Sequence, residues 1–400
     1  MKILVVCQHY WPEPYPLTEM CEELVRRGHE VHIVTDIPNY PQGEIYDGYG
    51  FGKLREEEHN GVRIFRAFTI PRKHNPFFRV LNYYSYSFFS SHLVKKLPGD
   101  YDVVFTNQTS PIMMVAAAMA YARKWNKKTL LYCMDLWPAS LSVGGISRGP
   151  VYQHYLRVSQ KYYGMADRIV GTSRMFAKYF EQVIGIPASR IGYIPQFADD
   201  SLRMAASPRH GSDEFRLVFA GNIGVAQSVD TILKAAAILQ HKETERRIII
   251  EIVGDGSEYE NMKRLKDELQ LDNVHFTGRL PKEQMPEVYG EADAMLVTLI
   301  RDEFVSYTLP AKVQSYMAAG KPIIAAADGE IPTVISESRC GICVPAEDHV
   351  SLAEAILNMS ENSDIEQMGN RARQYYDSHF AKLIVAAQLE EELQKLAASK

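Results

Sequence analysis

Short runs of apolar and β-branched residues alternate with helix-length amphipathic segments along almost the whole chain, and this alternation restricts the fold to parallel α/β architecture. The strand-like runs are 3–6, 31–35, 103–105, 129–132 and 169–171 in the first half, and 217–220, 248–253, 274–276, 294–298 and 323–326 in the second. We therefore predict two Rossmann-like doubly wound domains, 1–197 and 215–380, joined by a polar linker at 198–214. A last helix, 381–400, has no strand after it and is expected to pack back on the first domain.

Length and cysteine usage agree with a two-domain protein in a reducing compartment. Four hundred residues are more than one hydrophobic core usually organises. Of the five cysteines only Cys340 and Cys343 have CxxC spacing, and no second pair completes a zinc site, so we expect no metal. The chain begins with a strand-like run rather than a secretory signal, which indicates the cytoplasm. Its longest nearly apolar run, 111–122, is about half a membrane span.

Three glycine-bearing loops follow predicted strands in the second domain. Any one of them could be a plain tight turn. Since all three follow strands of one parallel sheet, they open on the same edge, where nucleotides bind in such folds. The residues that we expect to contact a nucleotide there are Gly221, Asn222, Ile223, Gly224 and Gln227 in the first loop, Gly254, Asp255 and Gly256 in the second, and Arg279 and Leu280 in the third.

The segment from Thr308 to Pro322 predicts a short helix over 310–319 with a cation in its first turn. Pro310 suits the first helical position, and Gly320 suits a left-handed stop. The unpaired N–H groups of its amino end, together with a full positive charge on Lys312, would attract a phosphate. Taken alone, the segment could equally be an ordinary surface helix with good caps.

These motifs resemble, in order, the nucleotide-sugar half of retaining GT-B glycosyltransferases of glycosyltransferase family 4. Four motifs of the first half are similar to one subgroup of that family, the capsule, O-antigen and colanic-acid transferases, which include N-acetyl-fucosamine transferases. They are Gln8-His9-Tyr10-Trp11-Pro12-Glu13, Arg27-Gly28-His29-Glu30-Val31, Pro38-Asn39-Tyr40-Pro41 and Asp135-Leu136-Trp137-Pro138. The resemblance covers essentially the whole chain and implies two Rossmann-like domains that face a central cleft.

The chain departs from that family at several positions. Relatives usually carry two glutamates eight positions apart, where this chain has Tyr307 and Ser315. The usual Arg and Lys of the first glycine loop correspond to Asn222 and Gln227. Lys312 and the loop backbones must then hold more of the diphosphate, and Ser315 can offer ribose only an uncharged hydrogen bond. Thr308 and Leu309 complete the donor residues that the resemblance implies.

The mechanism implied by the resemblance is a metal-independent transfer that retains configuration, in which the donor phosphate itself helps to deprotonate the acceptor. Lys312 beside glycine-loop N–H groups can stabilise the leaving diphosphate without a metal. The acidic pair Asp100 and Asp102 leads directly into the strand 103–105, so it is a strand entry rather than a metal clamp. No cofactor is expected beyond the nucleotide-sugar substrate.

In the first domain, Asp135 follows the strand 129–132, where it could orient an acceptor hydroxyl as a catalytic residue or simply cap a helix. Many relatives have His before this Asp, but this chain has Met134. The loops after two other strands should also face the cleft. Their expected acceptor-binding residues, with Trp137, are Tyr10, Trp11, Glu13, Asn107 and Ser110; for the two tryptophans, stacking on sugar competes with ordinary packing.

The segment 59–99 carries no acidic residue and is rich in basic and aromatic ones. Such a segment is typical of an interfacial membrane anchor, but it is equally consistent with a core helix that has a solvated basic face. If it contacts an anionic membrane surface, the acceptor would be a polyprenyl-diphosphate-linked saccharide. The residues expected at that surface are Arg72, Lys73, Phe77, Phe78 and Arg79.

Charge and motifs together favour a glycosyltransferase that uses a UDP-sugar. It would move the sugar, N-acetylated or deoxy, to a lipid-linked saccharide during bacterial surface-polysaccharide synthesis. Net charge is −5, with a positive first half and a negative second half, and no motif indicates nucleic-acid binding. The expected location is cytoplasmic and peripheral at the inner face of the plasma membrane. Two alternatives stay open: a UDP-sugar 2-epimerase, and a catalytically silent scaffold subunit, which the missing glutamates motivate.

Overall fold

The computed structural model describes residues 1–50, 52–53, 55–73, 76–146, 148–205 and 213–399 and divides the chain into two compact units. The first unit comprises residues 1–194 and 382–400, and the second comprises residues 195–381. The second unit therefore begins three residues before the expected linker at 198–214. Part of that linker, 206–212, lies outside the described residues, as do residues 74–75 of the basic segment and residue 400 of the expected last helix.

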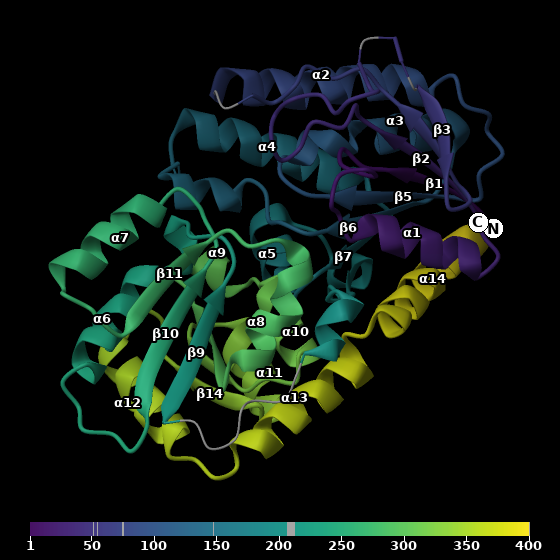
Figure 1. Ribbon diagram of the computed structural model, residues 1–400. Helices are drawn as coiled ribbons and strands as arrows, with labels where there is room; N and C mark the ends of the chain where they lie inside the picture. The colour runs from purple at the N-terminus through teal and green to yellow at the C-terminus, as the bar shows by residue number, and fades with distance from the viewer. Residues whose placement is uncertain (51, 54, 74–75, 147, 206–212, 400) are drawn as a thin grey trace. The chain divides into compact units, whose positions relative to one another are not determined.

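The first unit is built on one eight-stranded sheet with the order β3-β4-β2-β1-β5-β6-β7-β8, parallel except for the β3/β4 hairpin (Figure 1). The apolar runs expected as strands in this half of the chain all form strands, because each is buried between helices. Its strands are β1 (Lys2–Val6), β2 (Glu30–Thr35), β3 (Glu56–His59), β4 (Val62–Arg66), β5 (Val103–Gln108), β6 (Thr129–Cys133), β7 (Arg168–Gly171) and β8 (Ile191–Tyr193).

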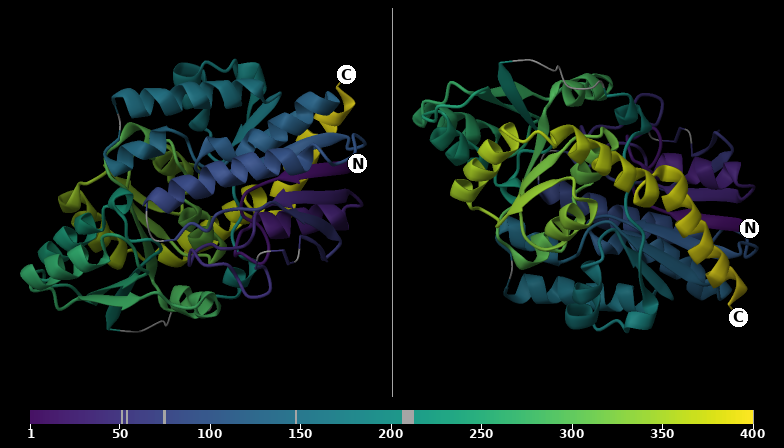
Figure 2. Two further views of the ribbon diagram at one scale, coloured as in Figure 1. Left: turned by 90° about the horizontal axis from the view of Figure 1, so that it is seen from above. Right: turned by 90° about the horizontal axis from the view of Figure 1, so that it is seen from below.

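Helices cover both faces of this sheet. Its helices are α1 (Leu17–Arg26), α2 (Pro76–Val94), α3 (Ala116–Trp125), α4 (Pro150–Met165), α5 (Phe176–Tyr179) and α14 (Lys382–Ala398). On one face, Leu4, Val6 and Val104 pack against α2 and α3. The last helix, α14, lies beside α1 (Figure 2). Glu390 on α14 accepts from Arg27 at 3.0 Å and contacts His29 at 2.8 Å, so the last helix is tied to the end of α1.

The second unit contains a six-stranded parallel sheet with the order β11-β10-β9-β12-β13-β14. Its strands are β9 (Glu214–Ala220), β10 (Arg247–Val253), β11 (Val274–Gly278), β12 (Ala294–Thr298), β13 (Ile323–Ala326) and β14 (Gly341–Val344). Its helices are α6 (Val229–Leu239), α7 (Tyr259–Glu268), α8 (Met285–Glu291), α9 (Glu303–Ser306), α10 (Ala311–Ala318), α11 (Glu330–Ser338), α12 (His349–Ser360) and α13 (Ile365–His379).

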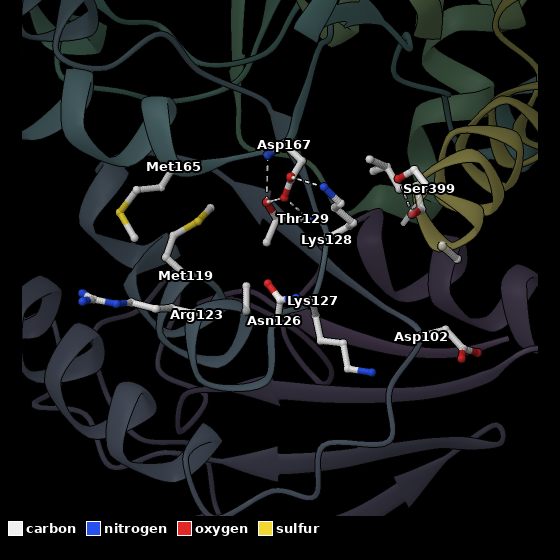
Figure 3. Close-up of a pocket in the computed structure, with 13 residues that line it drawn as sticks. Asp102, Met119, Arg123, Asn126, Lys127, Lys128, Thr129, Met165, Asp167 and Ser399 are labelled. Atoms are coloured by element: carbon white, nitrogen blue, oxygen red, sulfur yellow. Dashed lines mark hydrogen bonds and ion pairs between the residues drawn. The ribbon is translucent and has the colours of Figure 1, made fainter.

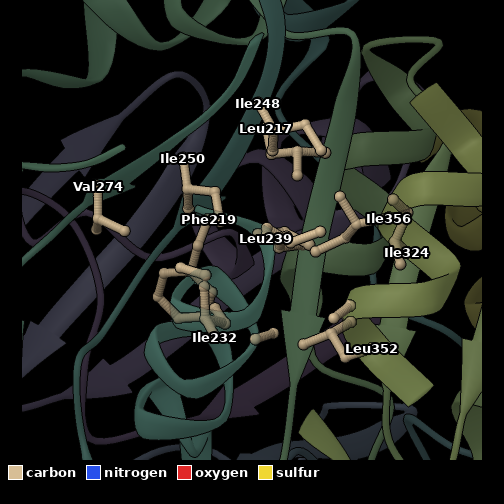
Figure 4. Packing of buried hydrophobic residues seen from close by; sticks show 14 of the residues in the cluster. Leu217, Phe219, Ile232, Leu239, Ile248, Ile250, Val274, Ile324, Leu352 and Ile356 are labelled. Carbon is tan, nitrogen blue, oxygen red and sulfur yellow. The ribbon is translucent and has the colours of Figure 1, made fainter. Parts of the chain in front are cut away.

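The core of the second unit lies between its sheet and two of these helices. Side chains of β9 and β10, among them Leu217, Phe219 and Ile250, pack against α6 and α12 in one buried cluster (Figure 4). The strands read as nearly continuous apolar runs because the sheet is covered on both faces. This packing fixes the carboxyl ends of the strands, which carry the loops of the predicted nucleotide site.

Candidate active site

Each sheet has a point at which strand order reverses, and in open α/β sheets such switch points hold ligands at the carboxyl ends of the strands. In the second unit the reversal lies between β9 and β12, and in the first it lies between β1 and β5. The glycine loop 221–224 follows β9 directly. Residues 7–16 follow β1 directly. The residues predicted for a ligand site in these two loops therefore lie at the switch points of the two sheets.

The three glycine loops of the second unit are joined by backbone hydrogen bonds. Gly221 N–H donates to Val253 O at 2.9 Å, and Gly254 N–H donates to Gly278 O at 2.9 Å. Ile223 N–H donates to Asp255 O, also at 2.9 Å. The loops after β9, β10 and β11 thus form one continuous surface at the edge of the sheet.

Several of the glycines are required by the approach of one loop to the next. Gly254 has a φ of +141°, and a Cβ added there would lie 1.8 Å from Gly221 O. A Cβ on Gly256 would lie 2.4 Å from Ile223 O. The side chain of Ile223 is fully buried and its carbonyl accepts from Glu258 N–H, so Ile223 holds two loops together instead of facing a donor. Asp255 likewise accepts from Gly256 N–H at 2.7 Å.

Lys312 lies over the end of β9. Its Nζ is 3.7 Å from the centroid of the Phe219 ring and donates to Gln227 Oε1 at 2.6 Å. A Cβ on Gly221 would lie 3.2 Å from the same Nζ, so the ammonium group is directly beside the first glycine loop. Burial lowers the pKa of Lys312 to about 7. The apolar surroundings therefore disfavour, near neutral pH, the full positive charge that the sequence predicts for Lys312.

The helix that carries Lys312 is slightly shorter than expected. The α10 helix begins at Ala311, and Pro310 is its extended N-cap residue, with φ −61° and ψ 136°. Gly320 follows the helix with a φ of +68°, as the left-handed stop requires. Gln227 was expected to act as a hydrogen-bond donor. Its side-chain oxygen accepts from Lys312, and its Nε2 has no hydrogen-bond partner in the described part of the chain.

Tyr307 and Ser315, which stand where relatives usually carry glutamates, both donate hydrogen bonds within the second unit. Tyr307 is buried and donates from its hydroxyl to Glu303 Oε1 at 2.8 Å, and burial raises its pKa to about 12. Ser315 Oγ donates to Ala311 O at 3.1 Å. Sequence analysis missed Glu303, although its position four residues before Tyr307, on the same face of a helical turn, is a signal that could have found it.

The other predicted donor residues differ in exposure. Thr308 Oγ1 donates to Val305 O at 2.7 Å, and Leu309 is a core residue with 2% exposure. Arg279 and Asn222 are exposed, and Leu280 is partly buried. Arg279 and Asn222 thus keep side chains that a ligand can contact, whereas Leu309 acts through packing.

In the first unit, the structure brings Asp135 and Ser110 together. Ser110 Oγ donates to the Asp135 carboxylate and lies 3.3 Å from Ser140 Oγ, and Gln108 Nε2 donates to Asp135 O at 3.1 Å. Burial raises the pKa of Asp135, and the serine hydroxyls oppose that rise. A carboxylate held in this way can accept a hydrogen bond from a hydroxyl group. Ser140 was not predicted, because it precedes no strand and belongs to no motif.

Glu13 has no free oxygen for an acceptor. It is 2% exposed, and its Oε1 accepts from the backbone N–H groups of Asn39 and Tyr40 at 2.6 and 2.7 Å. Its Oε2 lies 2.7 Å from His9 Nδ1. The expected acceptor-binding role of Glu13 was therefore wrong as a direct contact. The carboxylate instead joins the loops after β1 and β2.

The remaining predicted acceptor residues are mostly buried. Asn107 lies inside β5 instead of after it, with 5% exposure, because the strand continues to Gln108. Tyr10 is 1% exposed and Trp137 is 7% exposed, and the Tyr10 hydroxyl and Trp137 Nε1 are buried with no hydrogen-bond partner among the described residues. Trp11 is 37% exposed, and its ring stacks on that of His59 with the ring centroids 3.8 Å apart. Packing thus accounts for Tyr10 and Trp137 more simply than stacking on a sugar.

Three side chains in the loops after β1 and β2 have the types and positions that a metal ion would need. The ligand atoms of His9, Glu13 and Asp36 lie within 4.8 Å of one another, and all three residues are buried. Burial, with the negative charge of Glu13, raises the pKa of Asp36 well above its ordinary value. The absence of a metal cofactor stays a prediction.

The basic segment forms α2, whose two faces differ. Phe77, Val80, Tyr84 and Phe88 are 65%, 43%, 45% and 57% exposed and follow one another at helical spacing. The opposite face, with Tyr86 and four other residues, is buried. The buried face fits the interpretation as a core helix, and contact of the exposed face with a membrane stays a prediction. Among the described helices, none combines the length and apolarity needed to cross a membrane.

The basic residues before and within α2 are available at the surface. Lys73 and Arg79 are exposed, and Lys73 Nζ lies 4.8 Å from the ring centroid of Phe78, which is partly buried. Arg72 is partly buried. These cations lie at the amino end of the exposed aromatic stripe, which we define as Phe77, Val80, Tyr84 and Phe88.

A cavity of about 750 Å³ in the first unit contains none of the predicted residues (Figure 3). It is lined by Asp102, Thr129 and Asp167, which precede or begin strands, and by Met119 and Met165. Asp167 accepts from Thr129 N–H at 2.9 Å and therefore ties the starts of two strands. The cavity lies at the amino ends of the strands, opposite the edge that binds ligands in this architecture.

Comparison with known proteins decides the class of this chain. A family model described as glycosyl transferases group 1 matches residues 201–375, and a model described as glycosyltransferase family 4 matches residues 17–202. The chain is a glycosyltransferase with the GT-B fold. The two models match consecutive parts of the chain, and each covers most of one unit of this glycosyltransferase.

Two bacterial proteins named as glycosyltransferases are among the relatives of this glycosyltransferase. It is 26% identical to a probable glycosyltransferase, WbjE, of Pseudomonas aeruginosa, over 71% of this chain and 72% of that protein. It is also 26% identical to a putative colanic acid biosynthesis glycosyl transferase, WcaI, of Escherichia coli (strain K12), over 80% and 82%. The expected relation to colanic-acid transferases is therefore shown at the level of sequence similarity.

Solved structures show the same fold over the whole chain. Sucrose-phosphate synthase from Thermosynechococcus elongatus matches with a TM-score of 0.76 at 18% identity, covering 100% of this chain and 99% of that one. Anabaena HepE in complex with UDP matches with a TM-score of 0.71 at 15% identity, covering 99% and 100%. The predicted fold, two Rossmann-like α/β domains of the GT-B type, is confirmed.

Proposed function

We propose that this glycosyltransferase transfers a sugar, N-acetylated or deoxy, from a UDP-sugar to a lipid-linked saccharide in bacterial surface-polysaccharide synthesis. Transfer retains configuration and uses no metal. The single observation that carries the donor assignment is the position of Lys312, whose Nζ lies beside the glycine loop after β9. A cation at that point faces the place where a diphosphate meets a helix amino end in an α/β sheet.

UDP is the proposed nucleotide because a structural neighbour, HepE, was crystallised with it. Lys312 is the residue that we assign to the leaving diphosphate, since charge develops there during transfer. Asn222, Gly224 and Arg279 are among the exposed or partly exposed groups of the glycine loops that can contact the donor. The proposal for the acceptor places a sugar hydroxyl against Asp135.

The proposed location is the inner face of the plasma membrane, with the protein bound peripherally. The support is the exposed aromatic stripe of α2 together with Lys73 and Arg79. Apolar side chains on one helix face and cations beside them are what binding to an anionic interface requires. A lipid-linked acceptor would be presented at such a surface.

The experiment compares binding of UDP and of uridine to the wild-type protein and to Lys312→Ala, with EDTA present throughout. Loss of a charge-assisted hydrogen bond should weaken UDP binding by roughly 10- to 100-fold. Uridine binding should change by less than about twofold, because Lys312 contacts phosphate alone. Equal losses for both ligands would overturn the donor site.

A second readout separates an enzyme from a silent scaffold. If UDP binds without metal, UDP-sugars are offered with lipid-linked saccharides, and the anomeric configuration of the product is determined by NMR. Transfer with retention supports the whole proposal. Binding of UDP without consumption of any UDP-sugar would instead favour a scaffold subunit, and conversion of the donor alone would favour an epimerase.

A further inference from the structure

We propose that a cavity between α2, α3 and α4 binds the phosphate group of one anionic phospholipid. This inference rests on the membrane location given under the proposed function, and it adds a defined site for a single lipid. The cavity lies in the first unit and has a volume of about 510 Å³, which is within the usual range for ligand pockets, roughly 300–1,000 Å³. Its cations are Lys95, which directly follows α2, Arg123 and Lys124 on α3, and Lys161 on α4.

No carboxylate opposes these cations inside the cavity. The helices α2, α3 and α4 contain no Asp or Glu at any position, and no acidic side chain is among the described residues that line the cavity. Within the described part of the chain, Lys95, Arg123 and Lys161 form no ion pair with a carboxylate. A cavity walled by cations of one sign concentrates anions.

The nearest acidic residues of the adjoining cavity, the one of about 750 Å³, are already engaged. Asp167 pairs with Lys128 at 3.3 Å and accepts from Thr129 N–H. Asp102 accepts from Lys2 N–H at 2.6 Å. Their negative charge is therefore compensated where they lie, and it does not cancel the cations next door.

The carboxyl ends of α2 and α4 reach the cavity, and the partial negative charge of a helix end would repel an anion. Both ends are already bound by cations. Lys124 Nζ donates to Lys95 O at 2.5 Å, just after α2. Arg190 donates to Gly164 O at 2.9 Å and also to Ala166 O, at the end of α4. These carbonyl groups therefore compete little with a bound anion.

The cavity also has an apolar side. Met119 is 2% exposed and Met165 is 40% exposed. Both line this cavity and the adjoining one, as Arg123 does (Figure 3). Cations beside an apolar surface suit a phosphate that carries hydrocarbon better than they suit free phosphate.

The exposed aromatic stripe of α2 leads into the cavity. Residues on one face of a helix recur every three or four positions, so Ser91 and Lys95 continue the row after Phe88, and both line the cavity. With 19 residues, α2 is roughly 28 Å long. Lys73 and Arg79 lie at its amino end and the cavity at its carboxyl end. Cations at both ends of the stripe would hold α2 flat on an anionic surface, with one lipid phosphate in the cavity.

A monomeric short-chain lipid is the probe, because an anionic vesicle attracts any surface cation by about fivefold in affinity, wherever that cation lies. Dihexanoyl phosphatidylglycerol, below its micelle-forming concentration, is titrated into the full chain with and without saturating UDP. It should bind equally in both cases. Dihexanoyl phosphatidylcholine should bind at least about tenfold more weakly, because its choline group is positively charged. Inorganic phosphate should bind at least about tenfold more weakly, because it makes no apolar contact.

Two adjacent lysines give matched variants. Lys95 lines the cavity and Lys96 does not, and both are exposed. Lys95→Gln should weaken binding of the monomeric lipid at least about fivefold, because a charge-assisted hydrogen bond is lost, and Arg123→Gln at least about tenfold. Lys96→Gln should change it by less than about twofold. UDP affinity should stay within about twofold in all three variants. Thermal melts followed by circular dichroism check folding.

Four outcomes would overturn the site: no binding of monomeric phosphatidylglycerol, equal binding of phosphatidylcholine, equal weakening by Lys95→Gln and Lys96→Gln, or displacement of the lipid by UDP. Equal affinity for inorganic phosphate would overturn the assignment to a lipid. Sedimentation of the wild-type protein with phosphatidylglycerol vesicles separates this failure from that of the proposed location, because a protein that binds vesicles but no monomeric lipid lacks only the site. If UDP fails to bind to the folded protein, the proposed donor site fails, and the titration without UDP still tests the cavity.

Discussion

Lys312 is expected to take up a proton when the donor binds, and this uptake tests the proposed donor site more sharply than affinity alone. In the free protein, burial holds the pKa of Lys312 at about 7. A bound diphosphate places two formal negative charges at Nζ and favours the ammonium form. The pKa should then rise toward its ordinary value, 10.5.

The size of the effect follows from the two pKa values. At pH 8 roughly nine in ten Lys312 side chains of the free protein are neutral, so binding should take up about 0.9 proton. At pH 6 nearly all are already charged, and uptake should fall to about 0.1 proton. Donor affinity should decrease roughly tenfold per pH unit above about pH 8, because the protein must first acquire the proton.

Calorimetry in two buffers of equal pH and different ionisation enthalpy measures this uptake directly. UDP-glucose is the preferred ligand, because its diphosphate is doubly esterified, whereas a terminal phosphate titrates near pH 6. Lys312→Arg is the matched control: arginine stays protonated, so it should bind without uptake at pH 8. Uptake below about 0.2 proton in the wild-type protein at pH 8, or equal uptake in Lys312→Arg, would refute this reasoning.

Three further predictions concern other parts of the protein. Asp135→Asn should lower the kcat of sugar transfer at least about tenfold and leave UDP affinity unchanged, because the carboxylate is assigned to the acceptor. A changed UDP affinity with a normal kcat would contradict that assignment. The double variant Phe77→Ser and Phe88→Ser should bind anionic vesicles less in a sedimentation assay. Its melting temperature should not fall, since both side chains are exposed. Unchanged sedimentation would mean that the exposed face of α2 does not bind the membrane. Gly254→Ala should lower the free energy of unfolding in urea by more than about 3 kcal/mol, because its Cβ would overlap Gly221 O. Gly164→Ala is the control: it has open space at a helical position and should raise that free energy by roughly 0.5–1 kcal/mol. Similar effects of the two changes would refute the close approach of the loops.

Sequence patterning predicted the strands that are buried apolar runs and missed those that are not. All of the runs expected as strands form strands. The β3 strand reads Glu56-Glu57-Glu58-His59, which has no apolar alternation, because it pairs at the edge of its sheet. The turn at Asn60 and Gly61, both with positive φ, was the signal that could have found the β3/β4 hairpin. The short strands β8 and β14 are also edge strands.

The site was harder to predict because its decisive contacts join residues far apart in sequence. Lys312 was identified as the phosphate cation from its place in a helix. Its burial lowers its pKa, and one of its contacts there is with Phe219, more than ninety positions earlier, so the effect leaves no trace in local sequence. Glu13 was assigned to the acceptor because it follows a strand. Which of its oxygens remain free depends on Asn39 and Tyr40, which the pattern could not place beside it.

The two glutamates that this chain lacks have a consequence for how its donor site works. A carboxylate is still present beside Tyr307, because Glu303 reaches that hydroxyl from the preceding turn. The first glycine loop, however, offers neutral Asn222 and Gln227 where relatives have cations, and Lys312 beside that loop is close to half-protonated at pH 7. In the free protein Lys312 lies on Phe219 with its Nζ on Gln227. At and above neutral pH, full positive charge on Lys312 develops only when a diphosphate is bound, so affinity for the donor should depend on pH more steeply here than in a site with fixed arginines.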